Sequence, residues 1–257
     1  MTLATLHDMD WHFDWSLMGP PLLAGLLVAS THVLLGRRVL ERGIIFIDLT
    51  IAQVAALGVI VAGIGEDGGG LGTQLAAAVA ALAAAALLTW TEHKFRKLQE
   101  ALIGSLYVLS ACVAILVLAH NPHGAEHMQE LLAGQILWVS YAQLWPVAML
   151  YAVILLLWFT VVRTRPSLFY FLFALTVMAS VQLVGVYLVF ATLIMPAIAT
   201  SALPEKRGLP VGYLIAGCAY ALGLWLSVPF DLPAGPFIVC VLATLVIVTG
   251  IVRRLRR

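Results

Sequence analysis

The sequence predicts an all-α protein that crosses a membrane many times, and three observations lead to this fold class. Hydrophobic residues make up 62% of the 257 residues, and charged residues make up only 11%. The mean hydropathy is +1.02, whereas soluble domains carry roughly a quarter charged residues. The apolar residues also fall into runs about as long as the roughly 20 residues that a spanning helix needs. We therefore expect residues 1–257 to form one transmembrane domain of about eight or nine helices.

The apolar runs follow one another along the whole chain. They cover residues 17–36, 44–64, 71–90, 101–119, 141–162, 168–183, 184–202, 210–229 and 236–252. The sixth and seventh form one unbroken run of roughly 35 residues, which is too long for one ordinary crossing. We divide it near Gln182–Gly185 into two short helices. An eight-helix arrangement would need residues 168–202 to cross only once.

Two segments near the C-terminal end contain helix breakers at membrane depth. The apolar run Val184–Ala197 contains Gly185 and Pro196, and Asp231–Pro236 is a turn rich in Pro and Gly between two apolar runs. Such breakers are tolerated in a membrane only where protein or a cavity satisfies the freed backbone groups. This favours a core like that of a transporter over a bundle of simple anchors.

Lysine and arginine residues predict the orientation. They cluster after the first, third, fifth, seventh and ninth runs, at Arg37/Arg38/Arg42, Lys94/Arg96/Lys97, Arg163/Arg165, Lys206/Arg207 and Arg253/Arg254/Arg256/Arg257. Nine crossings place all five clusters on one side, and the positive-inside rule makes that side cytoplasmic. We expect residues 1–16 to be a periplasmic N-terminal segment and the C-terminus to be cytoplasmic. Eight crossings would put some clusters on the wrong face.

Five of the seven histidines then lie outside the membrane. The loop after the fourth run contains His120, His123, Glu126 and His127, and in a helix over 123–130 the last of these would share a face with His123. Imidazole and carboxylate groups suit zinc and similar ions, so these four residues are candidate metal ligands. The alternative is an ordinary polar loop, and the histidines of the N-terminal segment leave the same two interpretations.

Few polar side chains lie inside the predicted membrane region. Asp48, Thr50 and Gln53 fall in the second run, and His32 falls in the first. Intramembrane polar groups usually face a bundle interior or a water cavity, which makes Asp48, Thr50 and Gln53 candidates for a translocation pathway. For Thr50 and Gln53 the alternative is hydrogen bonding between helices. For His32 a packing role is the favoured interpretation.

Other features suggest packing rather than chemistry. We expect Cys112, Cys218 and Cys240 to be small core residues, because each lies inside an apolar run without metal-type spacing. The stretch Ala76–Ala86 predicts close packing on a neighbouring helix. The sequence contains no P-loop, no His-Glu-x-x-His motif and no Gly-x-Ser-x-Gly motif, so we expect neither nucleotide hydrolysis nor another enzymatic activity.

Several segments, taken in order, resemble the membrane permease subunit of bacterial ABC importers for zinc and manganese, the ABC-3 family. The matching segments are Phe46–Gly58, Glu100–Gly104, Leu131–Leu137, Val184–Thr200 and Asp231–Pro236. The last two are the most specific, and the coverage is nearly end to end.

The resemblance implies a permease in the bacterial inner membrane that works by alternating access. It would form a homodimer with two cytoplasmic ATPases and a periplasmic metal-binding protein. A divalent metal ion would be its substrate, and no cofactor would be bound permanently. The substrate would pass between paired copies of the second helix, where Asp48, Thr50 and Gln53 would line the path.

Two departures from the family pattern stand out. The family places Asp and His four residues apart on the second helix, whereas this chain has Leu49 and Gln53 there and its acid at Asp48. A shift by one residue rotates a helical side chain by about 100°. The family's Asp–His pair is therefore not intact, and the ion class remains open.

The second departure concerns coupling to the ATPase. The family carries a cytoplasmic coupling helix between its fifth and sixth spans, but only residues 163–167 separate the corresponding runs here. We expect Glu100, Arg163 and Arg165 to contact the ATPase, with the segments 91–100 and 204–210 as alternative docking loops. The alternative function is a permease fold that acts without an ATPase, as a partner, a sensor or a secondary carrier.

Overall fold

The computed structural model describes residues 15–63, 71–118, 132, 134, 136–162, 168–230 and 232–255. Within these residues the chain forms nine α-helices and no strand. The helices are α1 (Trp15–Arg42), α2 (Ile47–Gly63), α3 (Leu71–Lys94), α4 (Gln99–Leu118), α6 (Tyr141–Leu157), α7 (Phe169–Val184), α8 (Val186–Thr200), α9 (Glu205–Ser227) and α10 (Ala234–Leu255). Short helical turns occur at Arg96–Leu98, Ile136–Trp138 and Trp158–Val162, the last a π-helical continuation of α6.

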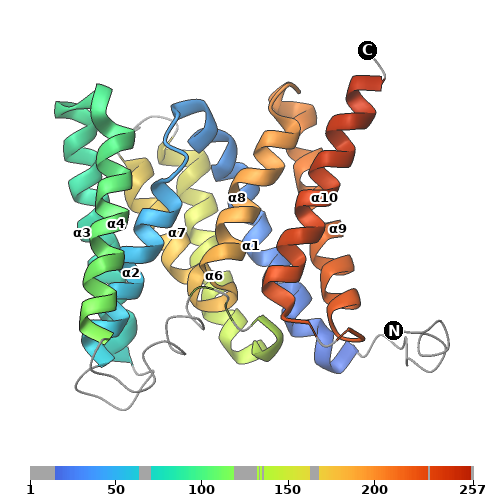
Figure 1. The fold of residues 1–257 in the computed structure, drawn as a ribbon, viewed down its shortest axis with the longest axis horizontal. Helices are drawn as coiled ribbons and strands as arrows, with labels where there is room; N and C mark the ends of the chain where they lie inside the picture. The colour runs from blue at the N-terminus through green and yellow to red at the C-terminus, as the bar shows by residue number, and fades with distance from the viewer. Residues whose placement is uncertain are drawn as a thin grey trace.

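The described helices run alternately up and down between two ends of the molecule (Figure 1). Six of them are long and apolar enough to cross a membrane, and the other three, α2, α7 and α8, are shorter apolar helices. In Figure 1, α1 begins at the bottom and α10 ends at the top, as an odd number of passes requires. The all-α multi-pass fold predicted from the sequence is confirmed, with nine described helices rather than eight.

Gly185 divides the long apolar run between α7 and α8, where the sequence placed the break. Its φ of 82° and ψ of 162° lie in a region that only glycine occupies without strain. Gly134, which also has a positive φ of 70°, rests on this break, and a Cβ there would collide with the carbonyl of Val184. The break is therefore held by close contact between two backbone segments that are distant in the sequence.

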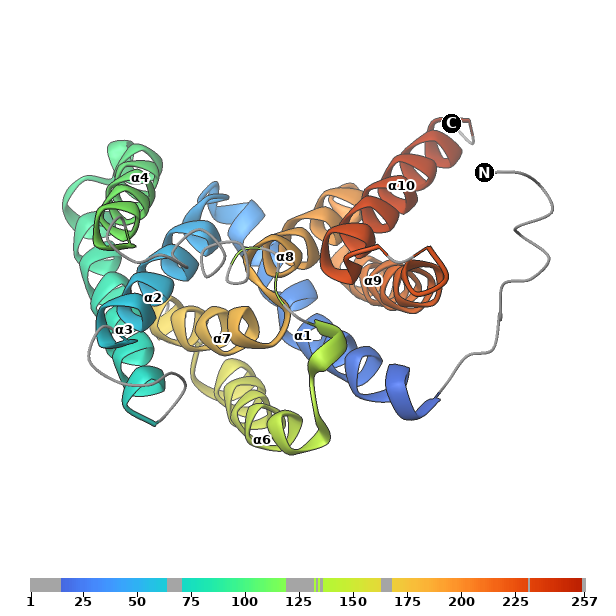
Figure 2. The ribbon, with the colours of Figure 1, turned by 60° about the horizontal axis from the view of Figure 1, so that its bottom comes forward.

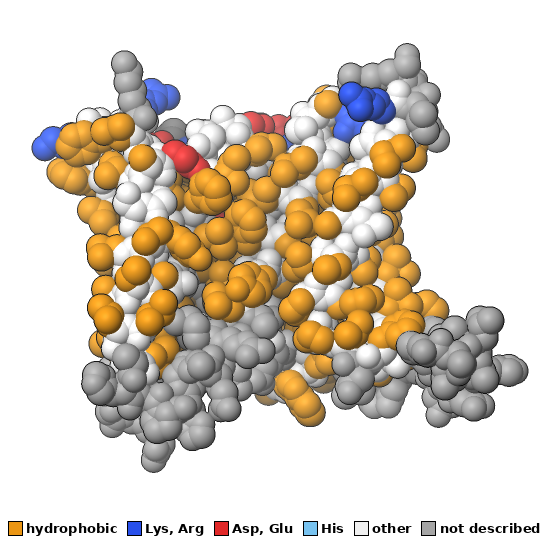
Figure 3. All heavy atoms as spheres, viewed as in Figure 1, with side chains coloured by type: hydrophobic (Ala, Val, Ile, Leu, Met, Phe, Trp, Pro, Cys, Tyr) orange, Lys and Arg blue, Asp and Glu red, His pale blue; other side chains and the backbone are white. Residues whose placement is uncertain are grey.

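The interior of the bundle is formed mainly by α1, α2, α7 and α8. In the end-on view of Figure 2, α7 lies between α2 and α6, and it contacts both helices. Of the most apolar part of α1, 72% is buried, against 17% for α4 and 17% for α10. The outer faces of these peripheral helices carry hydrophobic side chains, seen as orange over the waist of the molecule in Figure 3, as a lipid environment requires.

The expectation that the three cysteines lie in the core is wrong. Cys112, Cys218 and Cys240 are free and exposed on α4, α9 and α10. The physical reason is that the lipid-facing side of a membrane helix is as apolar as its packed side. Apolar neighbours along the sequence therefore do not distinguish the two sides.

The predicted close packing of the alanine-rich stretch is confirmed on α3. Ala77, Ala81, Ala84 and Ala85 are buried. A Cβ at Gly58 of α2 would lie only 2.8 Å from the carbonyl oxygen of Ala76 and 2.9 Å from the Cβ of Ala80. The small side chains of α3 let the backbones of α2 and α3 approach closely, as is common where membrane helices pack.

The described basic residues gather at one end of the bundle, at the top of Figure 3. Two of them bind the end of α8. Arg37 donates hydrogen bonds to the carbonyl oxygens of Thr200 (3.2 Å) and Leu203 (3.1 Å), and Arg253 donates to that of Ala199 (2.6 Å). Cations at a helix C-terminus satisfy its last carbonyls and interact favourably with the helix dipole.

Candidate functional site

The three pathway candidates on α2 are all buried. Asp48 is 1% exposed, Thr50 0% and Gln53 3%. The three side chains do not share one helical face. Asp48 and Gln53 are five residues apart, which separates them by about 140° around the helix. All three are nevertheless inside because α2 is packed between α3, α4, α7 and α8.

Thr50 connects α2 to α4. Its Oγ1 lies 2.9 Å from the carbonyl oxygen of Ile103 on α4 and 3.0 Å from that of Phe46 in the preceding turn. This is the hydrogen bond between helices that the sequence left open as an alternative for this residue. In the described bundle Thr50 faces α4, and its pathway role stays a prediction.

Asp48 differs from Thr50 in having an unpaired oxygen. It lies in the first turn of α2, where the positive end of the helix dipole favours a carboxylate. Its Oδ1 is buried and has no hydrogen-bond partner within the described part of the chain. A buried carboxylate oxygen without a donor is costly, so this position favours a cation or a proton as an additional partner. Chemically, Asp48 is the strongest pathway candidate of the three.

His32 has partners on both ring nitrogens. Its Nδ1 lies 2.9 Å from the carbonyl oxygen of Val28 and 3.1 Å from Oγ1 of Thr31, and its Nε2 lies 3.1 Å from Oγ of Ser180 on α7. The side chain is fully buried. These contacts tie α1 to α7 and agree with the packing role that the sequence favoured for His32.

The structure also shows buried polar groups that the sequence reasoning missed. Tyr151 of α6 donates to the carbonyl oxygen of Thr176 on α7 at 3.2 Å, and the hydroxyls of Thr192 on α8 and Tyr220 on α9 lie 2.8 Å apart. With the contact between His32 and Ser180, these bonds tie α1 and α6 to α7, and they tie α8 to α9. One available signal was the spacing of Thr176 and Ser180, which places two hydroxyls on one face of an apolar helix.

A second missed feature is a cavity of about 560 Å³ at the opposite end from the basic residues. Three amide side chains line it, Gln74 of α3, Gln143 of α6 and Gln182 of α7, together with Met178 and apolar residues of α6 and α7. The Gln143 Oε1 accepts a hydrogen bond from the backbone N–H of Ser140 at 2.9 Å, which caps the start of α6. The three amides are far apart in the sequence, so no local motif predicts that they line one cavity.

The predicted outer metal ligands, His120, His123, Glu126 and His127, lie outside the described residues, as does most of the N-terminal segment 1–16. Among the residues that are described, no group of three or more His, Cys, Asp or Glu side chains could hold a metal ion. The metal-capture interpretation of the outer loop stays a prediction.

The predicted ATPase contacts are described only in part. Arg163 and Arg165 lie outside the described residues. Glu100 is half-buried at the start of α4, and its Oε1 accepts a hydrogen bond from the backbone N–H of Phe46 at 3.4 Å. Glu100 therefore contacts the chain just before α2 begins, and its role toward an ATPase stays a prediction.

Comparison with known sequences gives matches along almost the whole chain. The sequence model of the ABC 3 transport family matches residues 14–165 and 161–253. An uncharacterised membrane protein of Synechocystis sp. is 26% identical over 98% of this chain and 96% of its own length. The manganese transport system membrane protein MntC of Halalkalibacterium halodurans is 26% identical over 93% of this chain and 90% of its own.

Comparison with solved structures gives the same architecture. A chain of PsaBC from Streptococcus pneumoniae, solved in complex with a Fab, superposes with a TM-score of 0.72 at 20% identity, over 96% of this chain and 93% of that one. A chain assigned to the metal-chelate type of ABC transporters, in an inward-facing conformation, gives a TM-score of 0.68 at 17% identity over 90% and 84%. At these identities the likeness concerns the fold.

Proposed function

The chain belongs to the ABC-3 transport family, and from this membership we propose that it is the permease subunit of an importer for divalent ions of the zinc or manganese class. The observation that carries the proposal is the family match, which spans residues 14–165 and 161–253. The family is one of metal-type ABC transporter permeases, which are multi-pass membrane proteins and not enzymes. The chain is accordingly a membrane component of such a transporter.

An ABC permease works with an ATPase and a solute-binding protein, and family membership implies both partners here. In our proposal two copies of the chain form a homodimer in the inner membrane, with two ATPases in the cytoplasm. The binding protein delivers the ion from the periplasm. The positive-inside rule supports this orientation, because the described Lys and Arg clusters share one end of the bundle.

The class of ion is supported by the similarity to MntC, whose name assigns it to manganese transport. Asp48 supplies a hard oxygen ligand and Gln53 an amide oxygen, and such ligands suit manganese better than zinc. The cavity lined by Gln74, Gln143 and Gln182 would add further amide oxygens at the outer end. We therefore favour manganese within the proposed class.

The mechanism that we propose is alternating access around α2. The ion is first held outside by the loop that contains His120, His123, Glu126 and His127. It then passes between the α2 helices of the two copies, where the buried Oδ1 of Asp48 provides a negative partner. Closure of one end and opening of the other would be driven by the ATPase, since this chain contains no P-loop.

The test is affinity purification of the tagged chain from its native membrane in mild detergent, followed by identification of what binds to it. We expect an ATPase in stoichiometric amount. Reconstituted with its binding protein, the complex should import radioactive manganese or zinc only when ATP is present inside the vesicles. Two results would refute the importer and favour a permease fold that acts without an ATPase. One is the absence of an ATPase under conditions that keep other membrane complexes intact, and the other is transport without ATP.

A further inference from the structure

A charged cavity opens at the end of the bundle that carries the basic clusters. Its volume is about 390 Å³. The residues that line it come from the end of α1, the connection to α2, the end of α3 and the start of α4, namely Glu41, Arg42, Ile44, Glu92, Arg96 and Gln99. Two acids, two arginines and an amide therefore surround one cavity at this end of the bundle.

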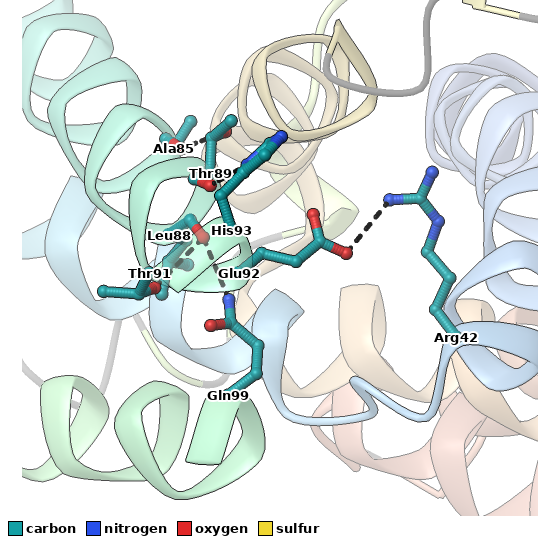
Figure 4. Close-up of polar contacts among 8 residues, drawn as sticks. All are labelled: Arg42, Ala85, Leu88, Thr89, Thr91, Glu92, His93 and Gln99. Carbon is teal, nitrogen blue, oxygen red and sulfur yellow. Dashed lines mark hydrogen bonds and ion pairs between the residues drawn. The ribbon is translucent and has the colours of Figure 1, made fainter. Parts of the chain in front are cut away.

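One wall of the cavity has an acceptor without a donor. Gln99 is 5% exposed, and its Nε2 donates to the carbonyl oxygen of Leu88 at 3.0 Å (Figure 4). That bond fixes the amide, and its Oε1 is buried without a hydrogen-bond partner among the described residues. The hydroxyl of Tyr170 lies beside Gln99 and Glu92, and it can itself donate to an acceptor. The buried Gln99 Oε1 is the group that can take a hydrogen bond from a donor outside the described part of the chain.

Glu92 also retains acceptor capacity. Figure 4 shows Glu92 of α3 and Arg42 of α1 pointing toward each other, joined by a dashed line. Their Oε1 and Nη1 atoms are 3.9 Å apart, and the side chains are 30% and 27% exposed. A strong ion pair of this kind is closer, at about 2.7–2.9 Å. The guanidinium of Arg42 also lies over the ring of Phe169, 4.3 Å from its centroid.

Exposed apolar side chains border the cavity on the α3–α4 turn. Trp90 is 54% exposed, Phe95 40% and Leu98 57%, and the ammonium of Lys94 lies 5.1 Å from the Trp90 ring centroid. Aromatic side chains and arginine are enriched in protein–protein interfaces. Lys94, Arg96 and Glu92 on the same turn place it at the water-facing end of the bundle, where a cytoplasmic partner can reach it.

We propose that the cavity and the α3–α4 turn form the docking site of the ATPase, which inserts an arginine side chain between Glu92 and Gln99. A guanidinium has five donors in a planar fork, so it can bind the Glu92 carboxylate through two of them and the Gln99 Oε1 through another. Arg96 at the mouth would pair with an acid of the same partner. This inference rests on the proposed function, and it supplies the docking surface that residues 163–167 are too few to form.

The experiment compares how much ATPase copurifies with the tagged wild-type chain and with three single variants. Glu92→Lys reverses the charge, and Glu92→Gln removes it at the same size. Arg254→Glu is the matched control, because it also reverses an exposed charge at the same end of the bundle, in the last turn of α10. Removal of one partner of a desolvated charge pair weakens binding by more than about tenfold. We expect that loss for Glu92→Lys, a smaller loss for Glu92→Gln, and none for Arg254→Glu.

A double variant separates docking from the internal ion pair. Arg42→Glu combined with Glu92→Arg restores opposite charges within the chain but leaves no acid at position 92. We expect it to elute as a folded, monodisperse protein and still to lack the ATPase. Recovery of the ATPase would show that Glu92 acts only inside the chain and would overturn the inference.

The remaining outcomes distinguish the two proposals. If the wild type retains the ATPase and both Glu92 variants retain it equally, the docking site is wrong and the importer stands. If the wild type itself retains none, the proposed function fails and the docking site fails with it.

Discussion

At the scale of single residues, the fold gives similar side chains different roles. Asp48, Thr50 and His32 are all buried within apolar helices. Thr50 is paired with α4 and His32 with α7, whereas Oδ1 of Asp48 is unpaired within the described part of the chain. The sequence could show that each polar group lies at membrane depth. It could not show which of them has a partner, because those partners are backbone carbonyls and hydroxyls on distant helices.

This difference predicts the effect of Asp48→Ala. We expect uptake of manganese or zinc to fall by about tenfold or more, which corresponds to about 1.4 kcal/mol of barrier. The reason is that the variant removes a carboxylate on α2 whose buried Oδ1 has no hydrogen-bond partner within the described part of the chain. Uptake would be measured in vesicles loaded with ATP, and membrane insertion would be checked by the yield of the purified protein.

The matched control for Asp48→Ala is Thr50→Val on the same helix. It removes the hydrogen bond to Ile103 and should lower the thermal stability of the protein more than its uptake rate. Normal uptake by a well-inserted Asp48→Ala protein would remove Asp48 from the pathway.

At the scale of the elements, hydropathy predicted the helices well, because a spanning helix has a fixed length in residues. It located the break at Gly185, since one glycine interrupts an apolar run of double length. It failed for Cys112, Cys218 and Cys240, which the sequence placed in the core. A membrane helix is apolar on both its lipid-facing and its buried side, so hydropathy does not distinguish them. Small residues, such as the alanines of α3 that pack against Gly58, do mark a buried side in the sequence.

The break between α7 and α8 predicts that Gly185→Ala is destabilising. A side chain at φ 82° and ψ 162° is strained by about 1–3 kcal/mol. We expect a clear fall in the thermal unfolding temperature of the protein in detergent. Gly250→Ala is the control, because a Cβ at Gly250 of α10 would meet no atom within 4 Å and alanine favours a helix. An equal unfolding temperature for both variants would mean that the break is not held in this conformation.

At the scale of the whole molecule, the distribution of charge agrees with the connectivity. The alternating helices bring the ends of α1, α3, α8 and α10 together, where Arg37, Arg253 and Arg42 bind neighbouring elements. The same arginines from which the positive-inside rule predicts the cytoplasmic side also hold the ends of these helices in place. Sequence reasoning predicted this common end from the clusters alone, but the cavity beside Glu92 required the tertiary fold.

The proposed orientation predicts from which side of the membrane a reagent can label a cysteine at each end of the bundle. Cys112, Cys218 and Cys240 are exposed on the lipid-facing helices, so a variant in which all three are alanine should fold. On this background, Lys206→Cys tests the basic end and Trp138→Cys the other end, because both positions are exposed. A membrane-impermeant maleimide should label position 138 in intact cells and position 206 only after permeabilisation. The reverse labelling pattern would mean that the basic end of the bundle faces outward. An imported ion would then have to enter at that end.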